Sequence, residues 1–258
     1  MLFRRIIFSA VCLGLLTGLL MSLFQYLGVT PIIIAAEQYE VQVAPGDHGG
    51  HSHGEQVMAP ANGLASQQAQ PPAEWEPADG IERNVYTAVS NVLAAIGFSA
   101  LLLSLMAQCQ LQGFASLSLA KGVLWGLAGF AVMFLAPSLG MPPEIPGLEA
   151  AAIEHRQGWW LLAVLCAALA LALFCYAPWL IKVFGVGLLA LPYLIGAPHP
   201  DGPAFSHPDP QTIEVLNALH HQFIFASALS SLLFWLVLGA ACGWVLNRQI
   251  LNAGASGD

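Results

Sequence analysis

Charged residues are scarce in this chain of 258 residues. They account for 9% of the residues, and hydrophobic residues account for 57%, whereas an ordinary globular chain has about 25% charged residues. A soluble protein with so little charge could not cover its surface with polar groups, but the outer surface of a membrane protein meets hydrocarbon. The chain also has no basic patch, which argues against nucleic acid as a partner. The composition therefore predicts an integral membrane protein.

Motifs of the common enzyme classes are missing as well. The chain has no GxxxxGK sequence followed by Ser or Thr, which argues against an ATPase, and no HExxH or GxSxG motif of the common hydrolases. We therefore expect neither enzymatic activity nor a tightly bound cofactor. A disulfide framework is not expected either, because the cysteines are odd in number and lack CxxC spacing. They are interpreted as small packing residues: Cys12, Cys109, Cys166, Cys175 and Cys242.

Six apolar runs are predicted to cross a bilayer, since a spanning helix needs about 20 such residues. They are Ile6–Ala36, Val85–Ala107, Leu119–Leu139, Gly158–Tyr176, Trp179–Ile195 and Phe223–Leu246. The first run is expected to bend near Pro31. We interpret it as an uncleaved anchor, because it is longer than the apolar core of about 7–15 residues in a signal peptide. The predicted class is an all-α, polytopic membrane bundle of about six transmembrane helices.

The middle of each apolar run lacks Asp, Glu, Lys, Arg and His. Ion-coupled transporters often place ionisable residues at this depth, so their absence argues against a self-contained proton-coupled pump. Gln25 and Asn91 are the notable polar groups there. A path for a divalent cation could still be formed by these two residues, methionines, hydroxyls or backbone carbonyls. Its energy could come from a partner or from the membrane potential.

Pairs of glycines at GxxxG spacing occur in three of the runs, and such pairs let helices approach closely. They predict a compact bundle rather than loosely associated anchors. The pairs are Gly14 and Gly18, Gly122 and Gly126, and Gly239 and Gly243.

Lysine and arginine predict the orientation, because they favour the cytoplasmic side. With six spans and both termini in the cytoplasm, that side holds Arg4, Arg5, Lys121, Lys182 and Arg248, and the external side holds Arg83 and Arg156. We accordingly divide the chain into four parts. They are an anchor helix (1–36), a flexible, largely disordered external loop (37–83), a five-helix membrane remainder (84–246) and a short cytoplasmic tail (247–258).

Histidines and acidic residues are distributed to one side in this topology. Every histidine is external, and fourteen of the fifteen acidic residues are external too, with Asp258 as the exception. Acidic residues contribute little to topology, so insertion rules do not account for this asymmetry. It points to a site for cations.

The densest group of potential metal ligands lies between residues 46 and 55. It contains Asp47, His48, His51, His53 and Glu55 among several glycines. Imidazole suits cobalt, nickel, copper and zinc, and carboxylates can supplement it. Binding would have to overcome the entropy of ordering this segment. The segment is interpreted either as a capture site that raises the local metal concentration or as a soluble His-rich linker.

Two further pairs stand near predicted helix ends. Glu37 and Glu40 would share one helix face if the first helix continues, so they could form the outer mouth of a cation path or a solvated helix end. His220 and His221 are placed at the start of the last helix, where adjacent side chains point about 100° apart. One could face the bundle and the other the membrane surface, or both could be polar capping residues.

The remaining candidates for metal binding lie in two external loops that are interrupted by prolines. They are Glu144, His155, His199 and His207.

An ordered set of short segments is spread over nearly the whole chain. It consists of Met1–Ile6, Pro31, Glu37–Glu40, Pro142–Gly147, Arg156-Gln157, Trp159-Trp160, Leu191-Pro192, Gly196–Pro198 and Phe234-Trp235. This pattern resembles the CbtA family, predicted cobalt transporter subunits. The resemblance implies a bacterial inner-membrane protein for cobalt uptake, linked to cobalamin supply. It also implies a small, single-span, His-containing partner of the CbtB type. It assigns no metal ligands.

The leading hypothesis is therefore a membrane component for uptake of Co²⁺ or a similar ion such as Ni²⁺. External His and acidic groups would collect the ion, and the bundle would conduct it inward. The alternative is a membrane-anchored metal-binding or assembly factor that transports nothing. Membrane lipid surrounds the protein in either case, and a homo-oligomer is an open alternative.

Overall fold

The computed structural model describes residues 2–40, 77–114, 118–200 and 202–254. Within these ranges the regular elements are helices, together with an isolated β-bridge between Leu148 and Phe205. In chain order the helices are α1 (Leu2–Gly28), α2 (Thr30–Glu40), α3 (Ile81–Leu111), α4 (Leu119–Phe130), the π-helical turn η1 (Ala131–Leu135), α5 (Ala136–Gly140), α6 (Ile153–Tyr176), α7 (Trp179–Ile195) and α8 (Pro210–Gly254). The predicted all-α class is confirmed.

Several helices are long and apolar enough to cross a membrane. In the described part of the chain they are Phe3–Gly28, Ile81–Leu111, Leu119–Gly140, Ile153–Tyr176 and Pro210–Arg248, and α7 is a shorter apolar helix. The third of these combines α4, η1 and α5. The chain is therefore a multi-pass membrane protein, as composition predicts. The predicted loop from 37 to 83 falls largely outside the described residues.

The helix boundaries differ from the predicted runs in two informative places. The first run is interrupted at Val29, so that Pro31 lies in the first turn of α2, where its missing N–H is tolerated. The last helix begins at Pro210 rather than near Phe223. His220 and His221 consequently lie inside α8, about three turns from its start, and the expectation that they stand at a helix start is wrong.

Glycine pairs bring the helices into close contact. A Cβ on Gly239 of α8 would lie 2.4 Å from the carbonyl oxygen of Gly122 on α4, and one on Gly126 would lie 2.2 Å from the carbonyl oxygen of Trp235. On α1, a Cβ on Gly18 would lie 2.5 Å from the Cα of Val92 on α3. Such contacts exclude any side chain, so the expectation of a compact bundle is confirmed for these helix pairs.

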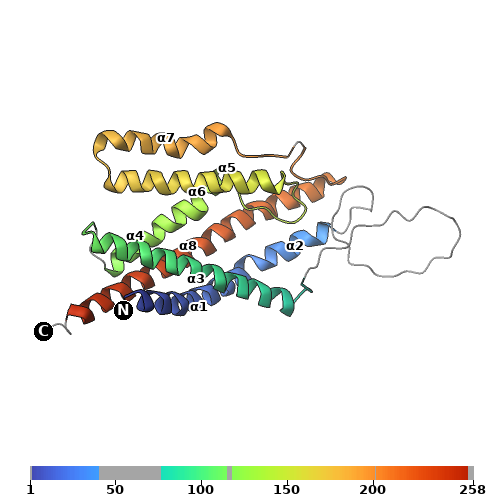
Figure 1. Ribbon diagram of the computed structural model, residues 1–258. Helices are drawn as coiled ribbons and strands as arrows, with labels where there is room; N and C mark the ends of the chain where they lie inside the picture. Colours follow the sequence, from blue (N-terminus) through green and yellow to red (C-terminus); the bar gives the residue numbers. More distant parts are fainter. Residues whose placement is uncertain (1, 41–76, 115–117, 201, 255–258) are drawn as a thin grey trace, which may run out of the picture.

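Helix α8 runs through the centre of the packing, because α1, α2, α3 and α4 all contact it. Its buried residues Leu238 and Cys242 join a core that includes Ala95 and Leu103 of α3. By contrast, α7 packs along α6, and this helical hairpin meets the rest of the bundle through η1 and α5 (Figure 1).

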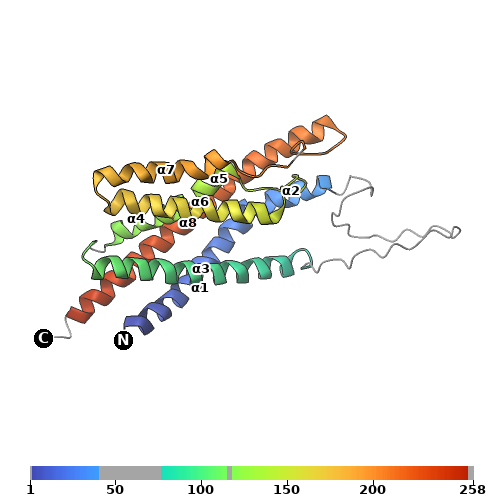
Figure 2. The ribbon, with the colours of Figure 1, turned by 45° about the horizontal axis from the view of Figure 1, so that its top comes forward.

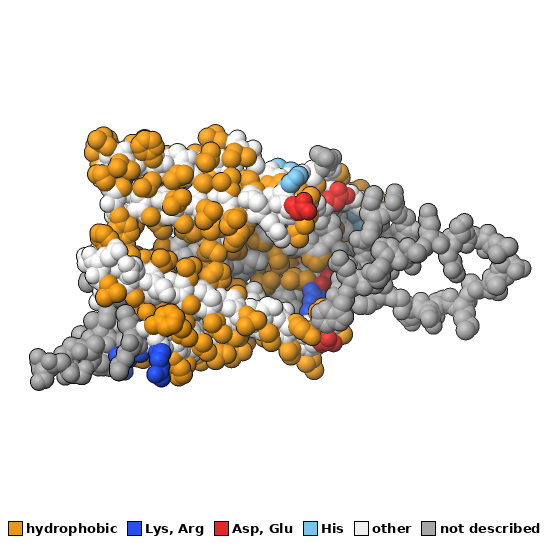
Figure 3. All heavy atoms as spheres, viewed as in Figure 1, with side chains coloured by type: hydrophobic (Ala, Val, Ile, Leu, Met, Phe, Trp, Pro, Cys, Tyr) orange, Lys and Arg blue, Asp and Glu red, His pale blue; other side chains and the backbone are white. Residues whose placement is uncertain are grey.

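The start of α1 and the end of α8 lie at one end of the bundle, which we call the proximal end (Figures 1 and 2). The opposite end, called the distal end, carries α2, the connections 141–152 and 196–209, and the first residues of α3, α6 and α8. Hydrophobic side chains cover the region between the two ends, while acidic and histidine side chains gather at the distal end (Figure 3). The bundle thus presents an apolar belt between two polar ends.

Candidate functional site

The His-rich segment with Asp47, His48, His51, His53 and Glu55 lies outside the described residues. The other predicted metal ligands all lie at the distal end. No three of the described His, Cys, Asp and Glu side chains converge in a way that could hold a metal ion. The predicted ligands in the described ranges are therefore dispersed over this end rather than assembled into a coordination site.

Two distal carboxylates are held by arginines. Glu37 on α2 accepts a hydrogen bond from Arg83 on α3, with 2.6 Å between Oε1 and Nη2. Glu144 of the 141–152 connection is paired in the same way with Arg156 on α6. Each pair joins two parts of the chain, so both carboxylates help to hold the distal end together. Glu40 is the last residue of α2.

His220 joins α8 to the 141–152 connection. Its Nε2 lies 3.0 Å from the carbonyl oxygen of Pro143, and its ring meets Phe205 edge-on with 6.3 Å between centroids. Phe205 in turn is buried with Ile145 in an apolar cluster at the distal end. His220 is half-buried and the neighbouring His221 is exposed. The two imidazoles lie roughly parallel, with 6.4 Å between their centroids, so that His220 packs against the connection and His221 remains exposed beside it.

Asp209 caps α8. Its Oδ1 accepts a hydrogen bond from the backbone N–H of Gln211 at 3.1 Å, and its Oδ2 accepts one from the Thr212 hydroxyl at 3.0 Å. The backbone bond and then the hydroxyl bond lower the pKa of the Asp209 carboxyl, because both stabilise the charged form. His207 accepts a hydrogen bond from the Asp209 backbone N–H through Nδ1 at 3.1 Å. These groups mainly define the start of α8.

Three of the predicted ligands are exposed and make no hydrogen bond with a described residue that would occupy their imidazoles. They are His155 on α6, His199 in the 196–209 connection and His221 on α8. Exposed imidazoles are accessible to a metal ion from solution.

A different polar group lies at membrane depth, between α1 and α3. Asn91 of α3 donates hydrogen bonds from Nδ2 to Gln25 Oε1 at 2.6 Å and to Ser22 Oγ at 3.1 Å, both on α1. Ser22 also donates to the carbonyl oxygen of Gly18 at 2.9 Å. The sequence identifies Gln25 and Asn91 as polar residues within spans, and the structure brings the two into direct contact.

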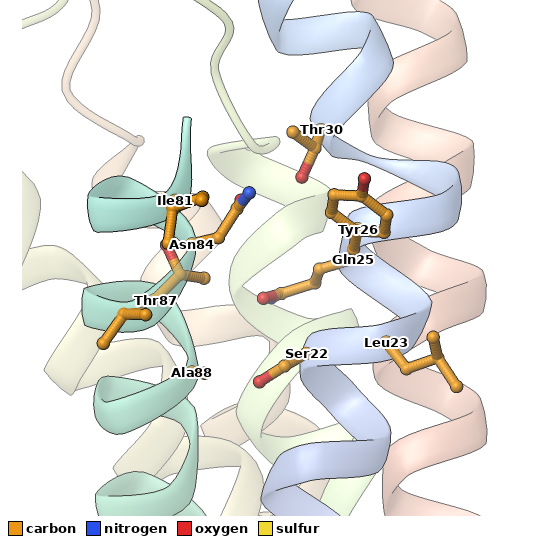
Figure 4. Close-up of a pocket in the computed structure, with 10 residues that line it drawn as sticks. Ser22, Leu23, Gln25, Tyr26, Thr30, Ile81, Asn84, Thr87 and Ala88 are labelled. Atoms are coloured by element: carbon orange, nitrogen blue, oxygen red, sulfur yellow. The ribbon is translucent and has the colours of Figure 1, made fainter. Parts of the chain in front are cut away.

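A cavity of about 430 Å³ lies beside this group, and we call it the polar notch. The polar residues that line it are Ser22, Gln25, Tyr26, Thr30, Asn84 and Thr87. Gln25 and Asn84 point from the two facing helices into the space between them (Figure 4). Apart from Gln25, these lining residues were missed in the sequence, although a stripe on α1 (Gly14, Gly18, Ser22, Gln25) and the i, i+3, i+7 spacing of Asn84, Thr87 and Asn91 on α3 could have revealed them.

The chain was also compared with known protein families, curated proteins and solved structures. Residues 3–247 match the family described as probable cobalt transporter subunit (CbtA). No curated protein and no solved structure matches the chain. The family match extends over nearly all of the helices described above, including those that form the distal end and the polar notch. The chain therefore belongs to the CbtA family of probable cobalt transporter subunits.

Proposed function

We propose that this protein is a membrane component for uptake of cobalt or a similar divalent transition metal. Histidine and acidic groups at the distal end collect ions, and the helix bundle passes them inward. The observation that carries the proposal is the one-sided distribution of these groups, because every histidine in the described part of the chain lies at the distal end. Nickel is a second candidate ion, since imidazole and carboxylate ligands bind it generally more tightly than cobalt.

The proposed orientation places the distal end outside the cell and both termini in the cytoplasm of a bacterium, with the bundle in the inner membrane. The basic residues support it, since Arg4, Arg5, Lys121, Lys182 and Arg248 lie toward the proximal end. The two distal arginines are paired with Glu37 and Glu144. A fluorescent protein fused after Asp258 tests this, because it should fluoresce only if the C-terminus is cytoplasmic.

The proposed collecting groups fall into two sets. One comprises the exposed His155, His199 and His221, which are spread over the distal surface. The other is the segment 46–55, whose imidazoles and carboxylates are clustered in sequence. Ligands that are not held together in advance bind weakly, because ordering them costs entropy. They would raise the local ion concentration rather than hold a resident metal.

Cell-associated metal, measured with and without the gene, tests the proposal. Cells with the gene should accumulate more cobalt from a low external concentration, and unchanged cobalt, nickel, zinc and copper would overturn it. Deleting residues 46–55 should reduce uptake at low metal and spare it at high metal. Deleting residues 60–69 is the matched control, because that segment has the same length and contains neither histidine nor acid.

A second candidate function is a membrane-anchored metal-binding or assembly factor that moves no ion. It is favoured by the lack of Asp, Glu, Lys, Arg and His near the middle of the described spans. Purified protein in vesicles that contain a metal-sensitive dye separates the two. A dye signal that depends on the protein supports transport, and metal binding without a dye signal supports the second function.

The family name describes a subunit, so partner subunits are part of the proposal. We propose a small single-span, His-containing protein of the CbtB type as the partner, and self-association is the alternative. Uptake should be compared in cells that contain this chain with and without the small protein. Equal uptake in the two strains would exclude the small protein as a required component.

A further inference from the structure

We propose that the polar notch is a water-filled site that holds a divalent cation together with its hydration shell, through uncharged amide and hydroxyl groups. The inference rests on the proposed function, because that function supplies the cation. It adds a place in the membrane where the ion is held and a mode of recognition that uses no histidine, cysteine or carboxylate.

Unpaired polar atoms beside the notch favour water in it. Both hydrogen bonds of Asn91 are donated by Nδ2, and Gln25 accepts one of them through Oε1. Asn91 Oδ1 and Gln25 Nε2 thus have no hydrogen-bond partner among the described residues. In hydrocarbon each such atom would cost several kcal/mol. Neither atom is sealed inside the protein, and Gln25 lines the cavity, so water in the cavity can satisfy Gln25 Nε2.

The notch extends into the bundle from the distal end. The deepest residue of α3 that lines it is Ala88, seven residues after the start of α3 at Ile81, which corresponds to about 10 Å along a helix. The hydrocarbon core of a bilayer is about 30 Å thick, so the notch lies in the distal part of the span. Ile81 and Tyr26 are 84% and 56% exposed, and Val85 and Leu23 are 54% and 50% exposed, so the notch is open at its distal end and along its outer side.

The floor of the notch is closed. Toward the proximal end, α1 and α3 touch through their backbones, since a Cβ on Gly18 would lie 2.5 Å from the Cα of Val92 and one on Gly14 would lie 2.4 Å from the Cα of Ile96. No ion passes between backbones this close. The notch is therefore a binding site reached from the distal end rather than a continuous pore.

The lining selects a hydrated ion. Six waters occupy about 180 Å³ in the liquid, and the cavity of about 430 Å³ accommodates them around an ion. Amide and hydroxyl groups both donate and accept hydrogen bonds, so they can bind the waters of the shell. Removing the shell of a small divalent cation would cost far more than the several kcal/mol for burying a carboxylate or an ammonium group, and no lining residue carries a charge to offset that cost.

Thiol reactivity tests whether the notch holds water. In a chain with its five cysteines replaced, Asn84→Cys and Ala88→Cys line the notch, and Leu93→Cys is the control because Leu93 is 64% exposed on the lipid-facing side of α3. A cationic, membrane-impermeant thiosulfonate added from the distal side should modify the two notch cysteines and not the control. Failure to modify Ala88→Cys, or equal modification of Leu93→Cys, would overturn the proposal.

Protection by ions tests the mode of recognition. Cobalt chloride should slow modification of Ala88→Cys about tenfold at a concentration about ten times its dissociation constant. Magnesium chloride should protect too, and so should cobalt(III) hexaammine, whose ligands do not exchange. Protection by Co²⁺ alone would show direct ligation and overturn recognition through the shell. Modification that no ion slows would show a water-filled notch without a cation site.

Uptake measurements separate this inference from the proposed function. Asn84→Leu fills the notch and leaves the bonds of Asn91 in place, so uptake should fall while the protein remains in the membrane. Normal uptake with Asn84→Leu would overturn the notch as part of the path. If the unmodified chain takes up no metal, the proposed function fails, and the thiol results still decide whether the notch holds a hydrated cation.

Discussion

Replacing Gly239 by alanine tests the packing of α8 against α4. The added Cβ would lie 2.4 Å from the Gly122 carbonyl oxygen and 2.5 Å from the Gly126 nitrogen. Ordinary contact distances are about 3.5 Å, so the two helices must separate by about 1 Å. Overpacking costs about 1–3 kcal/mol, and the upper part of that range applies because backbone atoms, which cannot rotate away, form both contacts.

The expected loss for Gly239→Ala is thus about 2–3 kcal/mol, which corresponds to an unfolding equilibrium shifted about 30- to 140-fold. Unfolding in detergent micelles can be followed through tryptophan fluorescence, since Trp235 is buried at this interface. Gly187→Ala on α7 is the control, because its Cβ would meet no heavy atom within 4 Å. That variant should be as stable as the original chain or up to about 1 kcal/mol more stable. Equal stability of the two alanine variants would refute the packing argument.

Three other predictions concern polar side chains. The Ser99 hydroxyl is fully buried without a partner among the described residues, so Ser99→Ala should raise the unfolding free energy by about 1–3 kcal/mol, and a less stable variant would contradict this. Arg83 and Glu37 are 31% and 33% exposed, so their coupling in a double-mutant cycle should be at most about 1 kcal/mol. The folded pKa of Asp209 lies below its ordinary value of 3.8, so its stabilisation is complete above that value and disappears as the pH falls through the folded pKa. The protection factor of the Gln211 amide in hydrogen exchange should accordingly fall in acid, or at neutral pH in Asp209→Ala, and an unchanged protection factor in that variant would exclude the cap.

Hydropathy was sufficient to predict the spans, because the bilayer selects long apolar runs whatever the tertiary packing. It gave the bounds of α7 correctly and the ends of α8 poorly. The first turns of α8 are polar and lie beyond the apolar belt, and helix formation there depends on the Asp209 cap and on Leu216 and Phe223 packing into the distal apolar cluster. Hydropathy therefore predicts the part of a helix that lies in the hydrocarbon, but it does not predict how far the helix continues beyond the membrane.

For the candidate sites, too, the sequence predicts which residues are polar but not which of them meet in the fold. Gln25 and Asn91 are visible in the sequence as polar residues within apolar runs, yet their mutual contact depends on the register between α1 and α3. That register follows from Gly18 lying against Val92, a long-range contact that no local pattern specifies. The histidines were predicted as a class, but the pairing of His220 with the Pro143 carbonyl required the folded 141–152 connection.

The central position of α8 has a consequence for biogenesis. Helices α1, α3 and α4 enter the membrane early, but each packs against α8, which is synthesised after them. Gly122 meets its partner Gly239 only after more than a hundred further residues have been made, a delay on the order of 10 s at ordinary rates of translation. During that interval the glycine face of α4 lacks its partner helix in this chain. The contacts of α8 with the earlier helices therefore form late, whereas α1 and α3, which also pack against each other, can pair sooner. A chain truncated before α8 would leave all three early helices without their common partner.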